Sequence, residues 1–497
     1  MDVREDDEET PLVQHPEQPL AVIRTRTPLP WDQFWVVLLL QVSEPFATQT
    51  LAPFTPQLIR DIGVTHGDES LVGHYVGILQ SSYFAAQALT VLPWSQLSDH
   101  IGRKPVLLTA LFAISISMFS FGFSMTFFSL VVSRIICGAF NGSNGIVKSV
   151  VMDITDATNM PRAYGYMPLS FMLGNMIGPV VGGTFSRPAD RFPEIFGRSE
   201  LLKTYPYLLP CAVPATFAAI VWLVAYFRLK ESVPTKAPLW ELIKESFLRQ
   251  SYTKPSTGSL SDVLPNSSGE GTPGEVASRP RPLRAMLTPK VLSVTASYAT
   301  MALFHSAFTS IVPIFYATPV ELGGLSLDPP RIGAMLGASS LAHGTFQILF
   351  YARLNDRFGT GAVYTTGVLS GIPMVILFPV INALARAHGM SLAVWLAVGV
   401  QLMLVLNLVM CYPCVSLYIR AAAPNRASLG TTNGIGQFAV AGGRIIGPAS
   451  AASVFSYSMR EGHDAWSVYY FLMAIVLLAV GVSTLLPRDP RQWEDSE

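Results

Sequence analysis

Between two long apolar segments the chain reads Trp94-Ser95-Gln96-Leu97-Ser98-Asp99-His100-Ile101-Gly102-Arg103-Lys104-Pro105. This short stretch carries a carboxylate and two cations where two helices would meet, and such groups can form charge pairs that stabilise one conformation. Its central pattern, L-x-D-x-x-G, returns at 354–359, again after a long apolar segment. The repetition indicates a duplicated unit of membrane-spanning helices.

Apolar segments of membrane-spanning length surround both copies of the pattern. About 20 apolar residues cross the hydrocarbon core, and twelve such segments are predicted, six on each side of a central region. They lie at 34–57, 72–96, 106–124, 127–148, 163–186, 206–228, 289–317, 330–352, 362–383, 391–418, 428–456 and 465–486. The predicted fold is an all-α membrane protein whose twelve transmembrane helices form two pseudo-symmetric six-helix bundles.

The composition supports this class and excludes others. Half of the residues are hydrophobic and only 13% are charged, against about 25% in soluble proteins. A net charge of zero gives no basis for a nucleic-acid partner. All four cysteines lie in apolar segments, which argues against a disulfide framework. The sequence shows no phosphate-binding loop for ATP, no metal-ligand cluster and no clustered nucleophile, so we expect neither an enzyme nor a bound cofactor or metal.

The expected domain organisation follows from these segments. It comprises a disordered tail (1–29), a first six-helix bundle (30–228), a linker with an interfacial helix and a disordered stretch (229–287), a second bundle (288–487) and a short tail (488–497). Lys and Arg are more frequent in the tails, the linker and the loops on their side than in the opposite loops. This bias predicts cytosolic termini in a multi-pass membrane protein, with the plasma membrane as the expected location and the vacuolar membrane as the alternative.

A second repeated pattern lies inside the helices. The fifth predicted helix holds Gly174-x-x-x-Gly178-Pro179, followed by Gly182 and Gly183, and the eleventh holds Gly443-x-x-x-Gly447-Pro448. Glycines four residues apart let helices approach closely. Because the two patterns occupy equivalent helices of the two halves, they support the duplication and predict a substrate cavity between the bundles.

A few polar side chains interrupt the apolar helices. Glu44 and Arg134 are predicted at mid-depth, where a charge costs about 2.5–3.5 kcal/mol on insertion scales and must face a partner or water. Glu44 could bind and release a proton, or it could form a static ion pair with Arg134. Asn141 and Lys148 follow Arg134 at helical spacing and are expected on the same face of one helix.

Further candidates for the cavity wall lie in the second half. They are His305, His343, Asn433, Gln437 and Arg444. Both histidines could bind protons, although buried histidines that only complete a hydrogen bond would have the same sequence signal.

These motifs resemble a known family. The stretch from Trp94 to Pro105 resembles the G-x-L-x-D-x-x-G-R-K motif of the major facilitator superfamily, with Ser95 in place of the first glycine. The stretch from Gly174 to Gly183 resembles the G-x-x-x-G-P-x-x-G-G motif of drug:proton antiporters, which is associated with export. Arg134 with Gly138 resembles the R-x-x-x-G motif of the same carriers, whose arginine is implicated in proton coupling.

The resemblance extends to a fungal branch of these antiporters, akin to the plant zinc-induced facilitator-like carriers. It is carried by Glu44-Pro45, by Gly67-Asp68-Glu69 and by the segment 148–159, where Asp153 replaces an expected glutamate. The cysteine-rich element of the plant carriers is not visible, so their metal-linked role is not carried over.

The resemblance implies a monomeric, proton-coupled exporter of small organic molecules such as drugs, toxins or secondary metabolites. The proton gradient would supply the energy, and protons, a small-molecule substrate and the lipid bilayer would be its partners. Glu44 and Arg134 would couple protons. The cytosolic gate would comprise Asp99, Gly102, Arg103 and Lys104, with Asp356, Arg357 and Gly359 in the second half. The alternatives are a proton-coupled uptake symporter for a nutrient or metal chelate, and a non-transporting membrane sensor.

Overall fold

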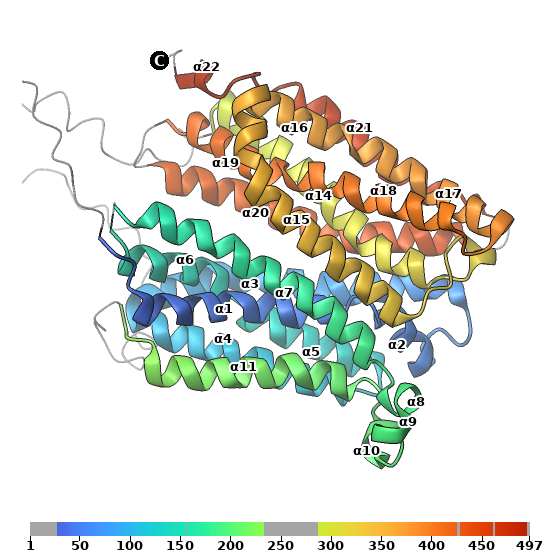
Figure 1. The fold of residues 1–497 in the computed structure, drawn as a ribbon. Helices are drawn as coiled ribbons and strands as arrows, with labels where there is room; N and C mark the ends of the chain where they lie inside the picture. Colours follow the sequence, from blue (N-terminus) through green and yellow to red (C-terminus); the bar gives the residue numbers. More distant parts are fainter. Residues whose placement is uncertain (1–26, 157, 233–286, 425–427, 461–462, 495–497) are drawn as a thin grey trace, which may run out of the picture.

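The computed structural model describes residues 27–156, 158–232, 287–424, 428–460 and 463–494, and every regular element in these ranges is helical. Two groups of long helices lie side by side (Figure 1). The first comprises α1 (Trp31–Thr50), α3 (Val72–Ile101), α4 (Arg103–Gly122), α5 (Phe127–Phe140), α6 (Ser143–Ile154), α7 (Met160–Phe185) and α11 (Leu208–Arg228). The second comprises α14 (Pro289–Ala317), α15 (Pro329–Phe358), α16 (Thr360–Leu369), α17 (Gly371–His388), α18 (Leu392–Val409), α19 (Cys411–Ala422), α20 (Leu429–Ser458) and α21 (Ser467–Ser483).

Three consecutive pairs, α5–α6, α16–α17 and α18–α19, each act as one broken helix, so each group in the described residues contains six long segments. Within these residues, seven segments are long and apolar enough to span a membrane by length and hydropathy alone. The segments that fall short are α1, α3, α7 and α15, which carry polar residues along their length, and α21, which has 17 residues. The polar side chains that lower the hydropathy of these helices include those of the site described below.

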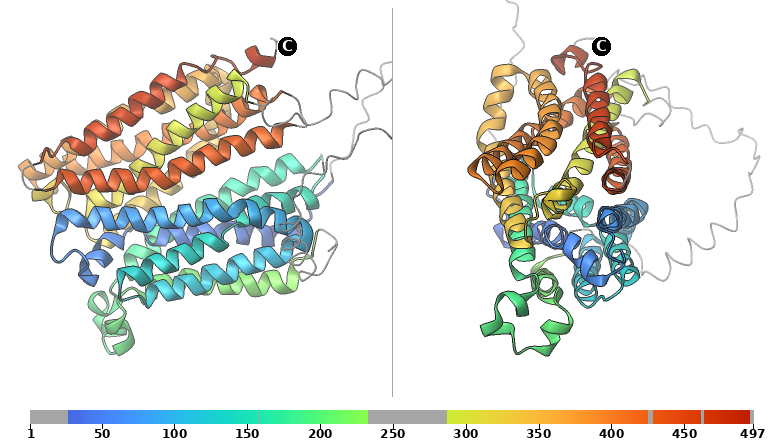
Figure 2. Two further views of the ribbon diagram at one scale, coloured as in Figure 1. Left: turned by 180° about the vertical axis from the view of Figure 1, so that it is seen from behind. Right: turned by 90° about the vertical axis from the view of Figure 1, so that its right-hand side faces the viewer.

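Short elements mark the two ends of the bundle. The helix α22 (Arg491–Glu494) and the start of α1 lie at one end, named the tail end here (Figures 1 and 2). At the opposite, far end lie α2 (Thr55–Ile62), η1 (Glu69–Leu71), α8 (Pro188–Arg191), α9 (Pro193–Phe196), α10 (Glu200–Thr204) and η3 (Val320–Leu322).

The two halves touch mainly along two antiparallel helix pairs, α3 with α20 and α7 with α15. In the first pair the Ser81 hydroxyl donates to the backbone carbonyl of Ile445 (2.7 Å), and the backbone amide of His74 donates to Ser456 (2.7 Å). A Cβ on Gly77 would lie 2.8 Å from the Ala452 side chain. Small residues therefore bring the far ends of the two halves into direct backbone contact.

Toward the tail end the same helices lose contact with the opposite half. Leu89, beyond Ser81 on α3, is 79% exposed, and Phe438, before Ile445 on α20, is 78% exposed. On the other pair, Leu349 and Phe358 of α15 are also exposed. The contacts between the halves thus lie toward the far end, whereas the two groups of helices diverge toward the tail end (Figure 1), in what is named the parted region here.

Residues at two predicted boundaries pack against the first bundle. The tail (1–29) was expected to be disordered, but Leu29 is buried and the Thr27 amide donates to the Thr158 hydroxyl (3.1 Å), because the apolar Leu29 packs into the core of the first bundle. The linker (229–287) also begins with packed residues, since Leu229 is buried. The predicted interfacial helix and disordered stretch lie outside the described residues.

Candidate functional site

A cluster of polar side chains lies inside the first half, between α1, α3 and α5. The carboxylate of Glu44 accepts hydrogen bonds from the Tyr83 hydroxyl (2.9 Å) and from the Gln87 amide (3.3 Å). The side chain of Asn141, just after α5, donates to the Tyr83 hydroxyl, and its backbone carbonyl accepts from Gln87. Burying a carboxylate is costly unless hydrogen bonds satisfy it, so these donors explain how an apolar helix tolerates Glu44.

Arg134 joins this cluster through an aromatic ring. Its side chain is buried, and its guanidinium carbon lies 4.2 Å from the centroid of the Tyr83 ring. Among the described residues Arg134 forms no ion pair, and its buried Nη1 has no hydrogen-bond partner. The sequence left open a direct ion pair with Glu44; instead, both charged groups contact the same tyrosine.

The fourth transmembrane segment is broken where the sequence predicted a continuous helix. Asn141, between α5 and α6, has φ −91° and ψ 68°, outside the helical region. Gly142 lies against Trp94 so closely that a Cβ would contact the indole. The predicted single face is therefore wrong beyond Asn141. On the predicted face, Arg134, Gly138 and Asn141 are buried, whereas Gly145 has open space around it and Lys148 is exposed.

The second half holds its own polar cluster. His305 on α14 shares a hydrogen bond with the Tyr412 hydroxyl on α19 (Nδ1 to oxygen, 2.9 Å). Gln437 on α20 donates to the Tyr298 hydroxyl (3.4 Å). Arg444, two turns further along α20, is exposed. These side chains come from three helices that face the first half or border the parted region.

The remaining candidates in the second half, Asn433 and His343, differ in their exposure and in their hydrogen bonds. Asn433 is exposed on α20, one turn before Gln437. His343 is half-buried, and its Nε2 donates to the backbone carbonyl of Leu402 (3.1 Å). This bond fixes one tautomer of His343 and occupies one of its two nitrogens.

The glycine motif of α7 is a packing surface. Gly174, Gly178 and Gly182 face α1, where an added Cβ would meet Pro45, Gln49 and Thr50 respectively. Gly183 instead faces the second half, against Pro329 and Gly333 of α15, and Gly333 in turn contacts the carbonyl of Pro179. On α20, Gly443 and Gly447 lie in the same way against Leu303, Ser306 and Ala307 of α14. The motif thus joins α7 both to α1 and to the opposite half.

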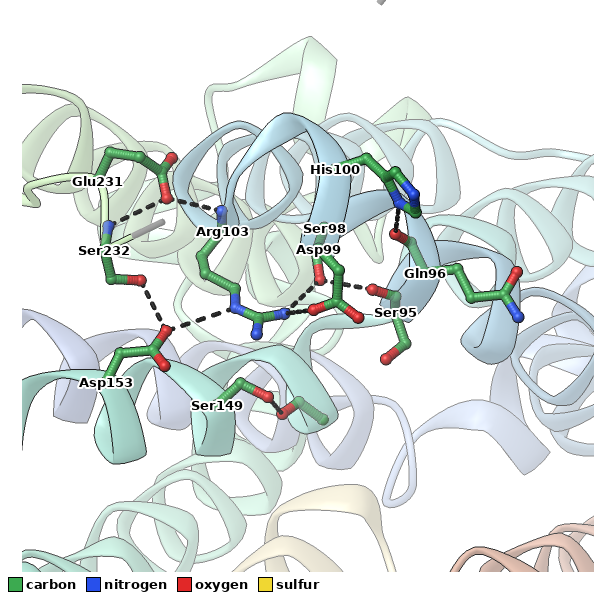
Figure 3. Close-up of polar contacts among 11 residues, drawn as sticks. Ser95, Gln96, Ser98, Asp99, His100, Arg103, Ser149, Asp153, Glu231 and Ser232 are labelled. Atoms are coloured by element: carbon green, nitrogen blue, oxygen red, sulfur yellow. Dashed lines mark hydrogen bonds and ion pairs between the residues drawn. The ribbon is translucent and has the colours of Figure 1, made fainter. Parts of the chain in front are cut away.

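Charged residues gather where α3 meets α4 at the tail end (Figure 3). Gly102 links the two helices with φ 101°, a conformation that favours glycine. From the first turn of α4, Arg103 pairs with Asp99 on α3 and with Asp153 on α6 (Nε to Oδ2, 3.5 Å). Arg103 also donates to the Ser98 hydroxyl (2.9 Å). The predicted turn is thus a compact helix junction with Asp99 still inside α3.

Glu231 completes this junction from the residues that follow α11. Its carboxylate accepts the backbone N–H groups of Arg103 (2.8 Å) and Lys104 (3.0 Å), which are donors that a helix leaves unpaired at its start. The neighbouring Ser232 hydroxyl donates to Asp153 (2.9 Å). A carboxylate at this position also complements the positive end of the α4 dipole. Lys104 binds the Tyr226 carbonyl with its ammonium group (2.8 Å).

The equivalent junction in the second half has the same turn but no such network. Gly359, between α15 and α16, has φ 81°. Within the described residues, Asp356 and Arg357 are exposed and neither forms an ion pair. The Thr360 hydroxyl, at the position of Arg103, donates to the Asn355 side chain (3.0 Å).

The turn between α6 and α7 is fixed by an exposed carboxylate. Asp156 accepts from the backbone N–H of Thr158 (2.7 Å) and from the Thr27 and Thr158 hydroxyls. The hydroxyl bonds and the backbone bonds together lower the pKa of Asp156 to about 2. The acidic segment that suggested a family resemblance therefore anchors the first described residues of the chain.

Sequence analysis missed several of these partners. Tyr83 and Gln87 are one turn apart on α3, and this spacing of polar side chains in an apolar helix could have identified them. Tyr298 and Tyr412 gave no comparable signal, because aromatic residues are common in such helices. Glu231 was assigned to the linker, where nothing in the local sequence indicates a partner more than 120 residues earlier.

Comparison with protein families agrees with this arrangement. The model of the Major Facilitator Superfamily matches residues 37–327, more than half of the chain. The chain belongs to this superfamily, and it is a multi-pass membrane protein and a secondary transporter for small molecules rather than an enzyme.

Its relatives in the superfamily are distant. The major facilitator-type transporter psiT2 of Psilocybe cyanescens is 28% identical, over 91% of this chain and 89% of the relative. The multidrug transporter mfsB of Aspergillus fumigatus is 26% identical, over 94% and 85%. The ZINC INDUCED FACILITATOR 1 protein of Arabidopsis thaliana is 27% identical, over 90% and 89%.

A solved structure supports the fold. The bacterial homologue of the human lysosomal transporter Spinster, in an inward-facing and occupied conformation, superposes with a TM-score of 0.62. It is 13% identical and covers 93% of this chain and 96% of its own. At this identity the likeness shows the shared fold alone.

Proposed function

We propose that this transporter is a proton-coupled exporter of small organic molecules that works by alternating access of the space between its two halves. Both termini and the linker would lie in the cytosol, so that the described conformation, parted at the tail end, would be open to the cytosol. The plasma membrane is the proposed location, with the vacuolar membrane as the alternative. The observation that carries the proposal is the enclosed carboxylate of Glu44, held by Tyr83 and Gln87.

This cluster supports a proton-binding role. A carboxylate within the membrane must change its protonation or its partners when its surroundings change. Tyr83 contacts Glu44 through its hydroxyl and Arg134 through its ring, so movement of α3 would alter both charged groups together. Arg134, with an unpaired buried nitrogen, is available to pair with Glu44 once that carboxylate is ionised.

The tail-end junction supports a gating role. Asp99, Arg103 and Lys104 tie α3, α4, α6 and the segment after α11 together within the first half. Among the described residues, Asp99, Arg103 and Lys104 make no ion pair with the second half. When the tail end closes, these charges would lie near the start of α20 and could exchange partners with it.

Export rather than uptake is favoured by two further observations. The chain carries the glycine motif of antiporters on α7, where Gly174, Gly178 and Gly182 pack on α1. Its relatives include a protein named as a multidrug transporter. Both observations bear on direction of transport, whereas neither identifies the substrate.

The test uses inside-out membrane vesicles that contain the full chain, with an imposed acid-inside proton gradient. Uptake of a panel of organic cations, neutral molecules and organic anions would be followed for wild type, Glu44→Gln and Arg134→Ala. We expect gradient-dependent uptake of at least one class in wild type, with a loss of roughly tenfold or more in both variants.

Glu200→Gln serves as the matched control, because Glu200 is exposed on α10 and, among the described residues, its carboxylate pairs only with Lys203 one turn later. Uptake that is indifferent to the gradient in every protein would exclude proton antiport. Flux in the opposite direction only would favour a symporter.

A further inference from the structure

Charged side chains are scarce in the middle of the described helices. With α5 and α6 counted as one segment, four Asp, Glu, Lys or Arg residues in the described helices lie at least six residues from both helix ends. They are Glu44, Arg134, Lys148 and Arg444. Three cations against one carboxylate leave this region with a formal charge of 3 − 1 = +2.

The single carboxylate is engaged within the first half. Glu44 accepts bonds from Tyr83 and Gln87 on α3. Arg134 is buried beside the same tyrosine, so it does not line the parted region. Glu44 therefore belongs to an internal cluster, and the two remaining cations determine the charge that a bound molecule would meet.

Lys148 and Arg444 approach this space from opposite halves. Lys148 is exposed on α6 and Arg444 is exposed on α20, and neither forms an ion pair with any described residue. Arg444 directly precedes Ile445, whose backbone carbonyl accepts from Ser81 on α3 (2.7 Å), so Arg444 lies where α20 meets the first half. Exposure to lipid would be costly for either cation, so both face the space between the halves.

Neutral hydrogen-bonding groups surround Arg444. Gln437 lies two turns before it on the same helix, and Tyr298 and Tyr412 carry hydroxyls on the neighbouring helices. The rings of Tyr298 and Tyr412 meet edge to face, with centroids 6.2 Å apart. These described groups offer hydroxyl and amide donors but no carboxylate, so they add no negative charge beside Arg444.

We propose that the substrate carries an anionic group, a carboxylate or a phosphoryl group, which Arg444 and Lys148 bind from opposite halves. Arginine presents a planar fork of donors that matches such a group, while lysine supplies a point charge. The bound anion would relieve the repulsion between the two cations and link the halves. This inference extends the proposed transport function by naming its substrate class.

The test measures binding without any proton gradient. Purified full-length protein in lipid nanodiscs would be tested by thermal shift with matched trios of carboxylate, amide and amine on benzene, indole and cyclohexane rings. We expect a carboxylate to stabilise the protein more than its amide and amine partners in at least one trio. Stronger stabilisation by the amines, or none by any carboxylate, would overturn the proposal.

Variants assign the effect to the two cations. For the best carboxylate, Arg444→Gln and Lys148→Gln are each expected to raise Kd, by roughly tenfold or more for Arg444. Arg444→Lys should retain part of the affinity. Arg460→Gln, an exposed arginine just beyond the end of α20, should leave Kd unchanged. Affinity within about twofold of wild type in both glutamine variants would contradict the assignment.

The experiments distinguish a failure of proton coupling from a failure of the anionic substrate class. If carboxylates bind but no gradient drives their flux, the binding site stands and proton coupling fails. If the gradient drives only cations, proton coupling stands and the anionic substrate class fails. If Arg444→Gln does not fold, Lys148→Gln alone tests the proposal, because Lys148 is exposed and forms no ion pair with any described residue.

Discussion

The two helix junctions at the tail end share a sequence pattern and a backbone turn, yet only one of them holds a charge network. Gly102 and Gly359 both adopt positive φ between two long helices. In the first half Arg103 follows the glycine and pairs with two aspartates, whereas in the second half Thr360 follows it. The glycine fixes the turn in both halves, and the next residue with its distant partners decides whether the junction is charged.

The two junctions are therefore stabilised by different contacts. The first junction binds α3, α4 and α6 through Arg103, and Glu231 caps α4. The second junction is instead covered by the chain after α21, because the amide of Gly361 donates to the carbonyl of Arg488 (3.1 Å). The charge network that we propose as a gate therefore lies in the first half.

The largest effect is expected for Arg103→Gln. The change leaves Asp99 and Asp153 without their cation, and its cost should be about 2–3 kcal/mol because the Arg103 side chain is mostly buried. The matched change, Arg357→Gln, removes an exposed cation without an ion pair and should stay within about 0.5 kcal/mol. The apparent Tm of each purified variant would measure the two losses of stability. Equal shifts in apparent Tm would contradict the expected difference between the two junctions.

A smaller difference is expected between Gly102→Ala and Gly359→Ala. Both place alanine in a region of positive φ and extended ψ that is essentially restricted to glycine, at a cost of about 1–3 kcal/mol. At Gly102 the new methyl group would also collide with the Glu231 carboxylate, whereas Gly359 has open space. Gly102→Ala should therefore lower the apparent Tm more. The collision should disappear in the double variant Gly102→Ala/Glu231→Ala, whose loss of apparent Tm should equal the sum of the losses in Gly359→Ala and Glu231→Ala. A loss that still exceeds this sum by the same amount would show that the collision is not its cause.

Glu231→Gln tests the electrostatic part of the cap on α4. The amide oxygen can still accept one backbone N–H, but the charge opposite the helix dipole is lost, at a cost of about 0.5–1 kcal/mol. The expected signature is a loss that shrinks at high salt, since a charge at an exposed helix end is screened. A loss that is independent of salt would favour steric packing over electrostatics. Glu194→Gln, on the exposed α9, is the control.

The smallest effect is expected when the first junction is copied into the second. Thr360→Arg places a cation next to Asp356, but the described residues offer no counterpart of Asp153 or Glu231 there. An exposed pair of this kind contributes about 0.2–1 kcal/mol, partly offset by loss of the Thr360–Asn355 bond. An unchanged apparent Tm would agree with this expectation. A large gain would mean that the local pattern alone suffices.

The sequence predicted the features that depend on local chemistry. Apolar segments of membrane length identify the helices, and the pattern around Gly102 identified both junctions because a positive φ at that point requires glycine. The antiporter glycines were recognised as a close-packing surface, and the structure places Gly174 and Gly178 against α1. The boundaries of the two bundles and the cytosolic side of the tails stay predictions.

The sequence was less informative where partners come from distant elements. It predicted a continuous face through Asn141, whereas the helix breaks there to fit Gly142 against Trp94. It treated the region after α11 as linker, although Glu231 binds α4. In both cases the decisive neighbour belongs to another helix, which no local periodicity records.

The sequence by itself determined that this is a duplicated, all-helical membrane protein, because hydrocarbon accepts only backbone that is hydrogen-bonded within its own segment. It also determined which few charges lie within the membrane. Only the tertiary structure decided the surroundings of these charges: Arg134 lies against a tyrosine, Arg103 lies between two aspartates, and Lys148 and Arg444 are exposed on helices of opposite halves. The cost of a buried charge is local, whereas the groups that offset it come from elsewhere in the fold.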